Sequence, residues 1–175
     1  MRRDGGYVKD LPGCTIRTIL YNRRHCPSST GLPSRCKGIE RQGIEVIASS
    51  SVYETAPQGE ILDQPDFLNA CLEIETELGP EELLDEAKAV ERELGREPAG
   101  RRHAPRPIDV DVLLLGPLEH ASARLTLPHA EISSRRFVLE PLLELDPGLT
   151  LPDGTLLANL LPRLADQRVT RAGAL

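Results

Sequence analysis

The chain has 175 residues, long enough for one domain with a substantial hydrophobic core. Its net charge is −6 at neutral pH, which makes nucleic acid an unfavourable main partner. No apolar run approaches the roughly 18 residues of a membrane span, and the N-terminus lacks the continuous apolar stretch of a secretory signal. We therefore expect a cytoplasmic protein.

Residues 1–40 differ in charge and composition from the rest of the chain. Residues 1–38 carry a net charge of +6 and residues 39–175 a net charge of −12. Arg, Pro, Ser and Gly crowd this segment, and only residues 15–20 could form a short strand. Three cysteines lie here at spacings that match no common zinc site: Cys14, Cys26 and Cys36. We expect an irregular N-terminal segment.

From residue 44 the pattern becomes regular. Residues 44–53 indicate a strand, residues 55–65 a loop with proline and glycine breakers, and residues 67–78 a second alternating strand. Pro80, followed by two glutamates, starts a helix whose apolar residues recur at helical spacing until Gly95.

The second half of the chain continues this alternation of strands and helices. The expected elements are a loop at 95–107, a strand at 108–115, a short strand at 124–126, a helix at 135–145, a terminal helix at 155–164 and a frayed tail at 167–175. This order is typical of an α+β domain. We place that domain at residues 41–165, between the irregular segment 1–40 and the tail 166–175.

The strand at 108–115 carries two carboxylates, Asp109 and Asp111, with one residue between them. Successive strand side chains point to opposite faces, so the carboxylates share one face while Val110 and Val112 point into the core. Adjacent like charges repel, and a hard cation such as Mg²⁺ would neutralise them. A Ca²⁺ site, or simply the solvated face of an edge strand, would give the same pattern.

An arginine-rich loop precedes these carboxylates. Residues 95–106 hold four arginines against one glutamate, and arginine binds phosphate oxygens bidentately. The chain has no P-loop or dinucleotide-binding glycine motif. Metal-binding carboxylates beside phosphate-binding arginines therefore suggest phosphoryl or pyrophosphoryl transfer from a nucleotide. We expect the loop to close over that nucleotide.

Residues 102–115, RHAPRPIDVDVLLL, resemble the signature of the 6-hydroxymethyl-7,8-dihydropterin pyrophosphokinases of folate biosynthesis. Two other parts of the chain resemble the same family, in its order and at about its spacing. Residues 49–58 with 63–70 are similar to its pterin-binding segment, and residues 124–129 with 135–144 to its nucleotide-side segment. The resemblance extends from about residue 43 to about residue 161.

The resemblance implies a ferredoxin-like antiparallel sheet with helices on both faces. It implies transfer of pyrophosphate from ATP to the pterin hydroxymethyl group, with release of AMP. Two Mg²⁺ ions held by Asp109 and Asp111 would bridge the ATP phosphates. Association with other folate-pathway enzymes would fit such an activity.

The resemblance also assigns roles to individual residues. Catalytic contacts to phosphate or metal fall on Arg96, Arg106, Asp109 and Asp111. Pterin contacts fall on Thr55, Ala56, Phe67, Asn69 and Phe137, with the two phenylalanines stacking on the ring and the Asn69 amide reading its edge. Nucleotide contacts fall on Glu91, Arg102, Val112, Arg124, Thr126, His129 and Arg135.

Plainer roles remain open for some of these residues. Phe67 and Phe137 could be core residues, Glu91 a solvated helical glutamate and His129 a structural histidine. The sequence also departs from the family pattern: His103–Ala104 replaces a frequent Trp–Gly, and Pro98 stands where an arginine can occur. A generic Mg²⁺-dependent nucleotide hydrolase is a further alternative, but it would leave Asn69 and the phenylalanines without a purpose.

The largest departure is that residues 1–40 show neither the family's first apolar strand nor the turn that follows it. A shifted reading frame or misassigned start would account for this together with the charge switch. We expect a sheet without its central strand to be unstable and poorly active. The alternative function is then a catalytically impaired or non-catalytic chain that binds pterin or nucleotide.

Overall fold

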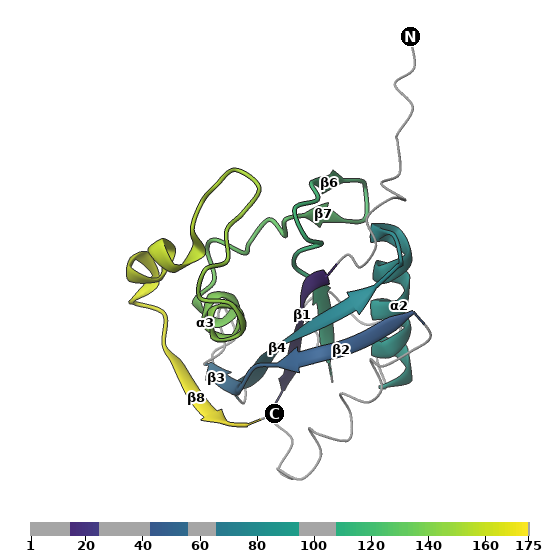
Figure 1. The fold of residues 1–175 in the computed structure, drawn as a ribbon. Coiled ribbons are helices and arrows are strands. Elements are labelled where there is room, and N and C mark those ends of the chain that lie inside the picture. The colour runs from purple at the N-terminus through teal and green to yellow at the C-terminus, as the bar shows by residue number, and fades with distance from the viewer. Residues whose placement is uncertain (1–14, 25–42, 56–65, 95–107, 175) are drawn as a thin grey trace.

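The computed structural model describes residues 15–24, 43–55, 66–94 and 108–174, and for residues 15–24 it describes the backbone alone. A six-stranded sheet runs in the order β5-β1-β4-β3-β8, with β2 also paired to β4, and every pairing is antiparallel. Helices pack against this sheet (Figure 1). The expected α+β architecture, an antiparallel sheet flanked by helices, is confirmed.

The elements follow one another along the chain as β1 (Thr15–Arg24), β2 (Ile44–Ser49), β3 (Val52–Thr55), β4 (Phe67–Thr76), α2 (Pro80–Glu93), β5 (Asp109–Val112), β6 (His120–Ala121), β7 (Thr126–Leu127), α3 (Arg136–Leu145), the 3-10 helix η1 (Leu157–Leu164) and β8 (Val169–Gly173).

Local sequence explains where α2 begins. Pro80 occupies its first turn, where a missing N–H costs nothing. The Glu82 carboxylate accepts the Gly79 N–H at 2.8 Å, and the two acids of the first turn face the positive end of the helix dipole. The apolar face of the helix is buried, as its spacing predicted: Leu83, Leu84, Ala87 and Val90.

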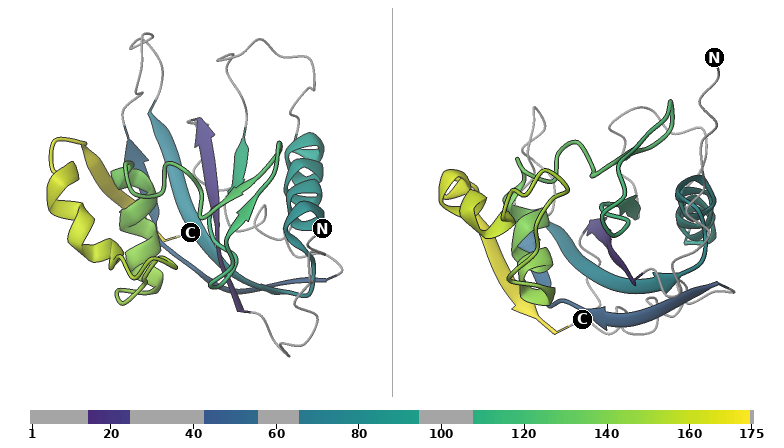
Figure 2. Two further views of the ribbon diagram at one scale, coloured as in Figure 1. Left: turned by 90° about the horizontal axis from the view of Figure 1, so that it is seen from above. Right: turned by 45° about the horizontal axis from the view of Figure 1, so that its top comes forward.

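Alternate residues of β4 serve two cores on opposite faces of the sheet. Leu72 and Ile74 join the core beneath α2, together with Val110 and Val112 of β5. Cys71 joins the core formed by α3 and η1. The two helices lie toward opposite ends of the sheet, α2 beside β5 and α3 near β3 and β8 (Figure 2).

The single strand predicted for residues 44–53 is wrong in one respect, because β2 and β3 are separate strands that break at Ser50 and Ser51. The Ser50 hydroxyl accepts the Cys71 N–H at 2.9 Å and donates to the Ser51 carbonyl at 2.7 Å. A serine side chain that bonds nearby backbone groups competes with the regular ladder, and sequence alternation does not report this.

The strand predicted for residues 108–115 is shorter than expected. Pairing ends at Val112, and the Leu113 carbonyl instead accepts the His129 N–H at 2.9 Å. Leu113 and Leu114 are buried beneath α3, whereas Leu115 lies in the core beneath α2. The continuous apolar run at residues 108–115 therefore reflects side chains that are buried in both cores, and it does not indicate a longer strand.

The short strand that the sequence allowed at residues 15–20 is present and extends to residue 24, so the expectation that this segment lacks the central strand is wrong for residues 15–24. These residues form β1, which pairs with β4 on one side and β5 on the other. The remainder of residues 1–40 lies outside the described part of the chain. A strand therefore occupies this place in the sheet, and the expected instability and low activity of the chain stay predictions.

The C-terminal tail is also more ordered than predicted. Residues 169–173 form β8, which pairs with β3 so that Arg171 lies opposite Tyr53. The Arg171 guanidinium donates to the Ser51 hydroxyl and lies 2.9 Å from the Glu144 carboxylate of α3. The predicted terminal helix is the 3-10 helix η1. None of the described helices has the length and apolar character needed to cross a bilayer.

Candidate active site

Strand β5 presents Asp109 and Asp111 on the face opposite its core residues. Ile108, Val110 and Val112 are at most 2% exposed and pack beneath α2, while the Asp109 side chain is 35% exposed. The alternation therefore places both carboxylates on the other face, as the sequence predicted. This is the face on which Cys71 meets α3.

The register across the sheet relates these carboxylates to Asn69. Asp109 pairs with Asn22 of β1, and Asn22 pairs with Asn69 of β4. Residues opposite one another in an antiparallel sheet share a face, and neighbouring strands lie about 4.8 Å apart. Asp109 and Asn69 are thus two strands apart on one face, with roughly 10 Å between their backbones.

The paired carboxylates place two negative charges close together, and the Lys88 ammonium lies 4.0 Å from the Asp109 carboxylate. Burial, and then the neighbouring Asp109 carboxylate, raises the pKa of Asp111, although Lys88, His129 and Arg135 oppose the shift. Hard oxygen donors that repel one another suit a divalent cation. Within the described ranges no group of three or more His, Cys, Asp or Glu side chains could hold a metal, so phosphate or water oxygens would have to complete its coordination.

This electrostatic arrangement predicts a pH-dependent stability difference for Asp111→Asn. A raised carboxyl pKa in the folded state means that ionisation opposes folding, so this penalty is absent at acid pH and grows as pH rises through the shifted pKa. The variant should exceed the parent in stability by on the order of 1 kcal/mol at pH 8, or about 2–4 °C in Tm. The difference should shrink toward pH 4.

Thermal unfolding of both proteins between pH 4 and pH 8 measures this effect. Asp153→Asn is the control, because the Thr155 N–H donates to the Asp153 carboxylate at 2.8 Å and the bond lowers the pKa of Asp153. The stability of Asp153→Asn relative to the parent should therefore fall, and not rise, as the pH increases. A Tm difference for Asp111→Asn that does not vary with pH would contradict the assignment.

Glu91 is not the solvated helical residue that its position allowed. Its side chain is 2% exposed and accepts the Val110 N–H at 2.8 Å and a hydrogen bond from Lys88 at 2.7 Å. Burial raises the pKa of Glu91, the bonds from Lys88 and Val110 oppose this, and Asp109 adds to it. Glu91, to which the resemblance assigns a nucleotide contact, therefore bonds to the backbone of β5.

His129 and Arg135 lie close enough to Asp111 to affect its pKa. Burial lowers the pKa of His129, which favours the neutral imidazole, although Asp111 opposes the shift. The His129 Nδ1 accepts the Glu131 N–H at 3.2 Å, which assigns the ring proton to Nε2 and makes that atom a donor. The Arg135 guanidinium pairs with Glu131 and lies 5.6 Å from the centre of the Phe137 ring.

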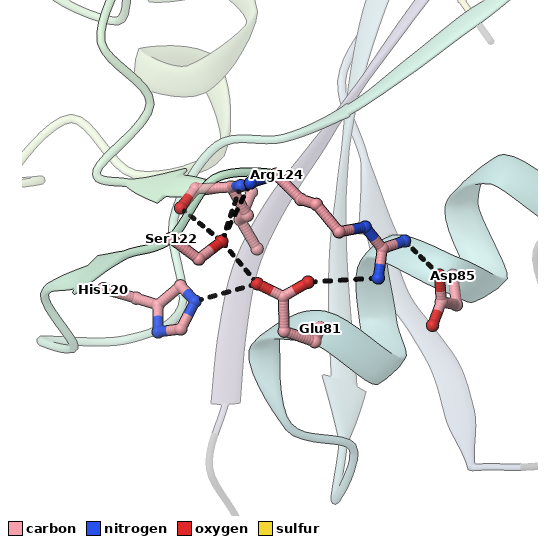
Figure 3. Close-up of polar contacts among 6 residues, drawn as sticks. Glu81, Asp85, His120, Ser122 and Arg124 are labelled. Atoms are coloured by element: carbon pink, nitrogen blue, oxygen red, sulfur yellow. Dashed lines mark hydrogen bonds and ion pairs between the residues drawn. The ribbon is translucent and has the colours of Figure 1, made fainter. Parts of the chain in front are cut away.

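Arg124 extends from the β6–β7 hairpin to α2 (Figure 3). Its guanidinium pairs with Glu81 at 3.3 Å and with Asp85, and its side chain is 52% exposed. Ser122 and His120 bond to the same Glu81 carboxylate at 2.6 Å and 3.2 Å. The hairpin is thereby attached to α2, and Arg124 would have to share its charge between these carboxylates and a nucleotide.

The other two predicted nucleotide residues differ in accessibility. Thr126 is exposed on β7, opposite Ala121. The Val112 side chain is 1% exposed in the core, so only its backbone could contact a nucleotide.

Two of the predicted pterin residues, Thr55 and Phe67, lie on β3 and β4 near Asn69. Its Nδ2 donates to the Thr55 hydroxyl at 3.0 Å and to the Tyr53 carbonyl at 3.3 Å. Its Oδ1 is buried and, among the described residues, has no hydrogen-bond donor. A buried acceptor without a donor is costly, so the site is suited to a ligand that supplies an N–H. Phe67 is half-buried and pairs with Thr55 across the strands.

Phe137 is both a core residue and a candidate ring-stacking residue. It is 8% exposed and packs in the core beneath α3, and Arg135 covers part of its ring. We expect Phe137→Ala to weaken pterin binding by about 1–3 kcal/mol and to lower the free energy of unfolding by about 3 kcal/mol.

Calorimetric titration of the variant with the pterin and, separately, with an ATP analogue checks this prediction. Leu139→Ala is the control, because Leu139 is fully buried in the same core and should cost stability without selectivity between ligands. Equal losses of affinity for both ligands in the Phe137 variant would make Phe137 a core residue alone.

Four predicted site residues lie outside the described residues: Ala56, Arg96, Arg102 and Arg106. The predicted closing loop at 95–107 lies outside them as well. Sequence reasoning also missed Lys88, whose ammonium group lies 4.0 Å from the Asp109 carboxylate. The signal that could have found it is its position three residues before Glu91, on the same face of the helix.

The chain is similar in sequence to a known protein family. The family model described as 7,8-dihydro-6-hydroxymethylpterin-pyrophosphokinase (HPPK) matches residues 27–147. The chain belongs to this family. The match covers β4, β5 and the candidate site, whereas β1 lies before it.

Two bacterial relatives align with about 70% of this chain. The pyrophosphokinase of Haemophilus influenzae is 40% identical over 126 residues, which is 72% of this chain and 78% of that protein. The enzyme of Methylorubrum extorquens is 44% identical over 123 residues, or 69% of this chain and 77% of that protein. The mitochondrial folate synthesis bifunctional protein of Pisum sativum is 44% identical over 109 residues, 62% of this chain but only 21% of that protein.

Proposed function

We propose that the protein transfers a pyrophosphoryl group from ATP to the hydroxymethyl group of 6-hydroxymethyl-7,8-dihydropterin in folate biosynthesis. The hydroxyl oxygen bonds to the β-phosphorus, the bond to the oxygen bridging the α- and β-phosphates breaks, and AMP leaves. The observation that carries the proposal is that Asp109 and Asn69 are both register partners of Asn22 in β1, so they lie on one face of the sheet. A phosphate-side group and a pterin-side group thereby lie roughly 10 Å apart.

On the pterin side, the Asn69 Oδ1 accepts an N–H from the edge of the ring, and Thr55 holds the amide in orientation through its hydroxyl. Phe67 and Phe137 would stack on the ring faces. Enclosing the ring in this way orients the hydroxymethyl group toward β5, and orientation supplies much of the rate of such transfers.

On the phosphate side, Asp109 and Asp111 fit Mg²⁺, because their hard oxygens share one face of β5 and their negative charges repel one another. Bound there, Mg²⁺ would neutralise charge on the phosphates and orient them. His129 Nε2 and the Arg135 guanidinium are donors for phosphate or ribose oxygens. Arg96, Arg102 and Arg106 would contribute further positive charge.

A non-catalytic binding protein is the alternative function. The relatives named as pyrophosphokinases and the presence of both carboxylates on one face favour the enzyme. The plant relatives are named as bifunctional folate synthesis proteins, which supports association with other folate-pathway enzymes. We place the protein in the cytoplasm, like a typical bacterial member of such a pathway.

The direct test is a coupled assay for AMP release from ATP in the presence of the reduced pterin and Mg²⁺. We expect AMP and pterin diphosphate to form in equal amounts, with no AMP when the pterin is omitted. Release of ADP or inorganic phosphate instead would indicate a hydrolase or an ordinary kinase. Tight binding of both ligands without AMP release would identify the non-catalytic alternative.

A further inference from the structure

Among the described strands, none pairs with the outer edge of β5. β5 ends the described sheet and pairs only with β1. Backbone groups on the free edge of a strand need another partner, because an unpaired N–H or carbonyl shielded from water costs stability. At Val110, the partners are two side chains of α2.

Lys88 and Glu91 bond both backbone groups of Val110. The Val110 N–H donates to the Glu91 carboxylate at 2.8 Å, and the Val110 carbonyl accepts from the Lys88 ammonium at 3.2 Å. The two side chains also bond to each other at 2.7 Å. Being three residues apart, they lie on one face of the helix. The pair thus replaces a neighbouring strand for a single residue.

The Lys88–Glu91 pair bonds to the backbone between the two carboxylates of the site, because Val110 separates Asp109 from Asp111. The Val110 side chain is fully buried beneath α2, and the Lys88 ammonium lies 4.0 Å from the Asp109 carboxylate. Any movement of the Val110 backbone would displace both carboxylates together. A buried ion pair adds little net stability compared with apolar packing, so stability alone does not explain why these charged groups lie here.

We propose that Lys88 and Glu91 are positioning residues, which hold the backbone of Val110 so that Asp109 and Asp111 are preorganised to bind the metal–nucleotide complex. The inference rests on the proposed function for the identity of the ligand. It assigns Glu91 a role through the β5 backbone, in place of direct contact with the nucleotide. Groups that orient metal ligands in this way commonly affect metal affinity or activity about 10–100-fold.

The test compares Glu91→Gln with Glu91→Met. The glutamine oxygen can still accept the Val110 N–H, whereas methionine cannot. We expect Glu91→Gln to remain within about threefold of the parent and Glu91→Met to lose about 10–100-fold in Mg²⁺-dependent affinity for a non-hydrolysable ATP analogue. Pterin affinity measured without nucleotide should stay unchanged. Glu93→Met is the matched control, since Glu93 is exposed on the same helix.

Amide hydrogen exchange at Val110 provides a readout that does not depend on activity. We expect faster exchange in Glu91→Met and exchange like that of the parent in Glu91→Gln. Lys88→Met, at a side chain 33% exposed, is the second variant if Glu91→Met does not fold, and it should weaken Mg²⁺-dependent binding about tenfold.

The outcomes separate the positioning role from the proposed function. Equal impairment of Glu91→Gln and Glu91→Met would mean that the charge itself is required, and this would overturn the positioning role. Parental exchange and parental Mg²⁺-dependent affinity in Glu91→Met, or in Lys88→Met where that variant replaces it, would overturn it as well. A parent protein that binds the Mg²⁺–nucleotide but releases no AMP would refute the proposed activity and leave this inference to be decided by exchange and affinity.

Discussion

Replacing Asp109 or Asp111 with alanine should lower kcat by on the order of 10³-fold. A metal-held carboxylate pair supplies several kcal/mol of charge neutralisation on the transferring group, and each 1.36 kcal/mol corresponds to about tenfold in rate. The fold should survive both changes, because the core residues of β5 lie on its other face. The loss should therefore appear in chemistry and nucleotide binding rather than in thermal stability.

Calorimetry with a non-hydrolysable ATP analogue, with and without Mg²⁺, measures the binding part of this effect. The parent should bind the analogue more tightly with Mg²⁺, and each variant should lose that dependence. Asp153→Ala is a suitable control, since Asp153 lies in an exposed turn after α3. Nucleotide binding that ignores both Mg²⁺ and the two substitutions would rule out Asp109 and Asp111 as the metal site.

Asn69→Leu should weaken pterin binding about 10–100-fold, with little change in affinity for ATP. The buried Oδ1 of Asn69 has no donor among the described residues, so a bound pterin N–H would gain a partner there that leucine cannot offer. Leaving the matching group of the ligand unpaired costs about 1–3 kcal/mol. A site built for such a bond discriminates strongly against a ligand that lacks it.

The effect of Asn69→Leu on protein stability should be small. The substitution removes an unsatisfied acceptor, which favours folding, and it also removes the bonds from Nδ2 to Thr55 and Tyr53, which opposes folding. Thermal unfolding and pterin titration of the same variant check both statements. Thr55→Val is the companion variant, since it removes the hydroxyl that holds the Asn69 amide but leaves Oδ1 in place. Full pterin affinity in Asn69→Leu would exclude Asn69 from the pocket.

The sequence by itself determined the features that depend on local periodicity. Alternation along β5 predicted that Asp109 and Asp111 share a face, and helical spacing with Pro80 and its acids predicted α2 closely. These predictions succeed because a side chain's direction in a strand or helix depends on near neighbours. The three segments that resemble the pyrophosphokinase family added residue roles that periodicity could not supply.

Only the tertiary structure decided which distant segments meet. The tail was expected to fray, yet β8 pairs with β3, and residues 15–24, where the sequence allowed only a short strand at 15–20, form a longer strand between β4 and β5. Strand pairing depends on partners far away in the chain. Hydrogen bonding and packing with neighbouring strands can therefore outweigh a weak local preference for the strand conformation.

For the candidate site too, the sequence predicted some features and only the packed structure decided the others. Sequence identified Asn69 and Glu91 as candidates, but the unpaired Oδ1 of the first and the bond of the second to Val110 appear only when β3, β4, β5 and α2 are packed together. The signal for Lys88 was only its position three residues before Glu91, because a lysine on a helix is usually solvated. Its role emerges from the free edge of β5, because that edge leaves backbone groups for which α2 provides the partners.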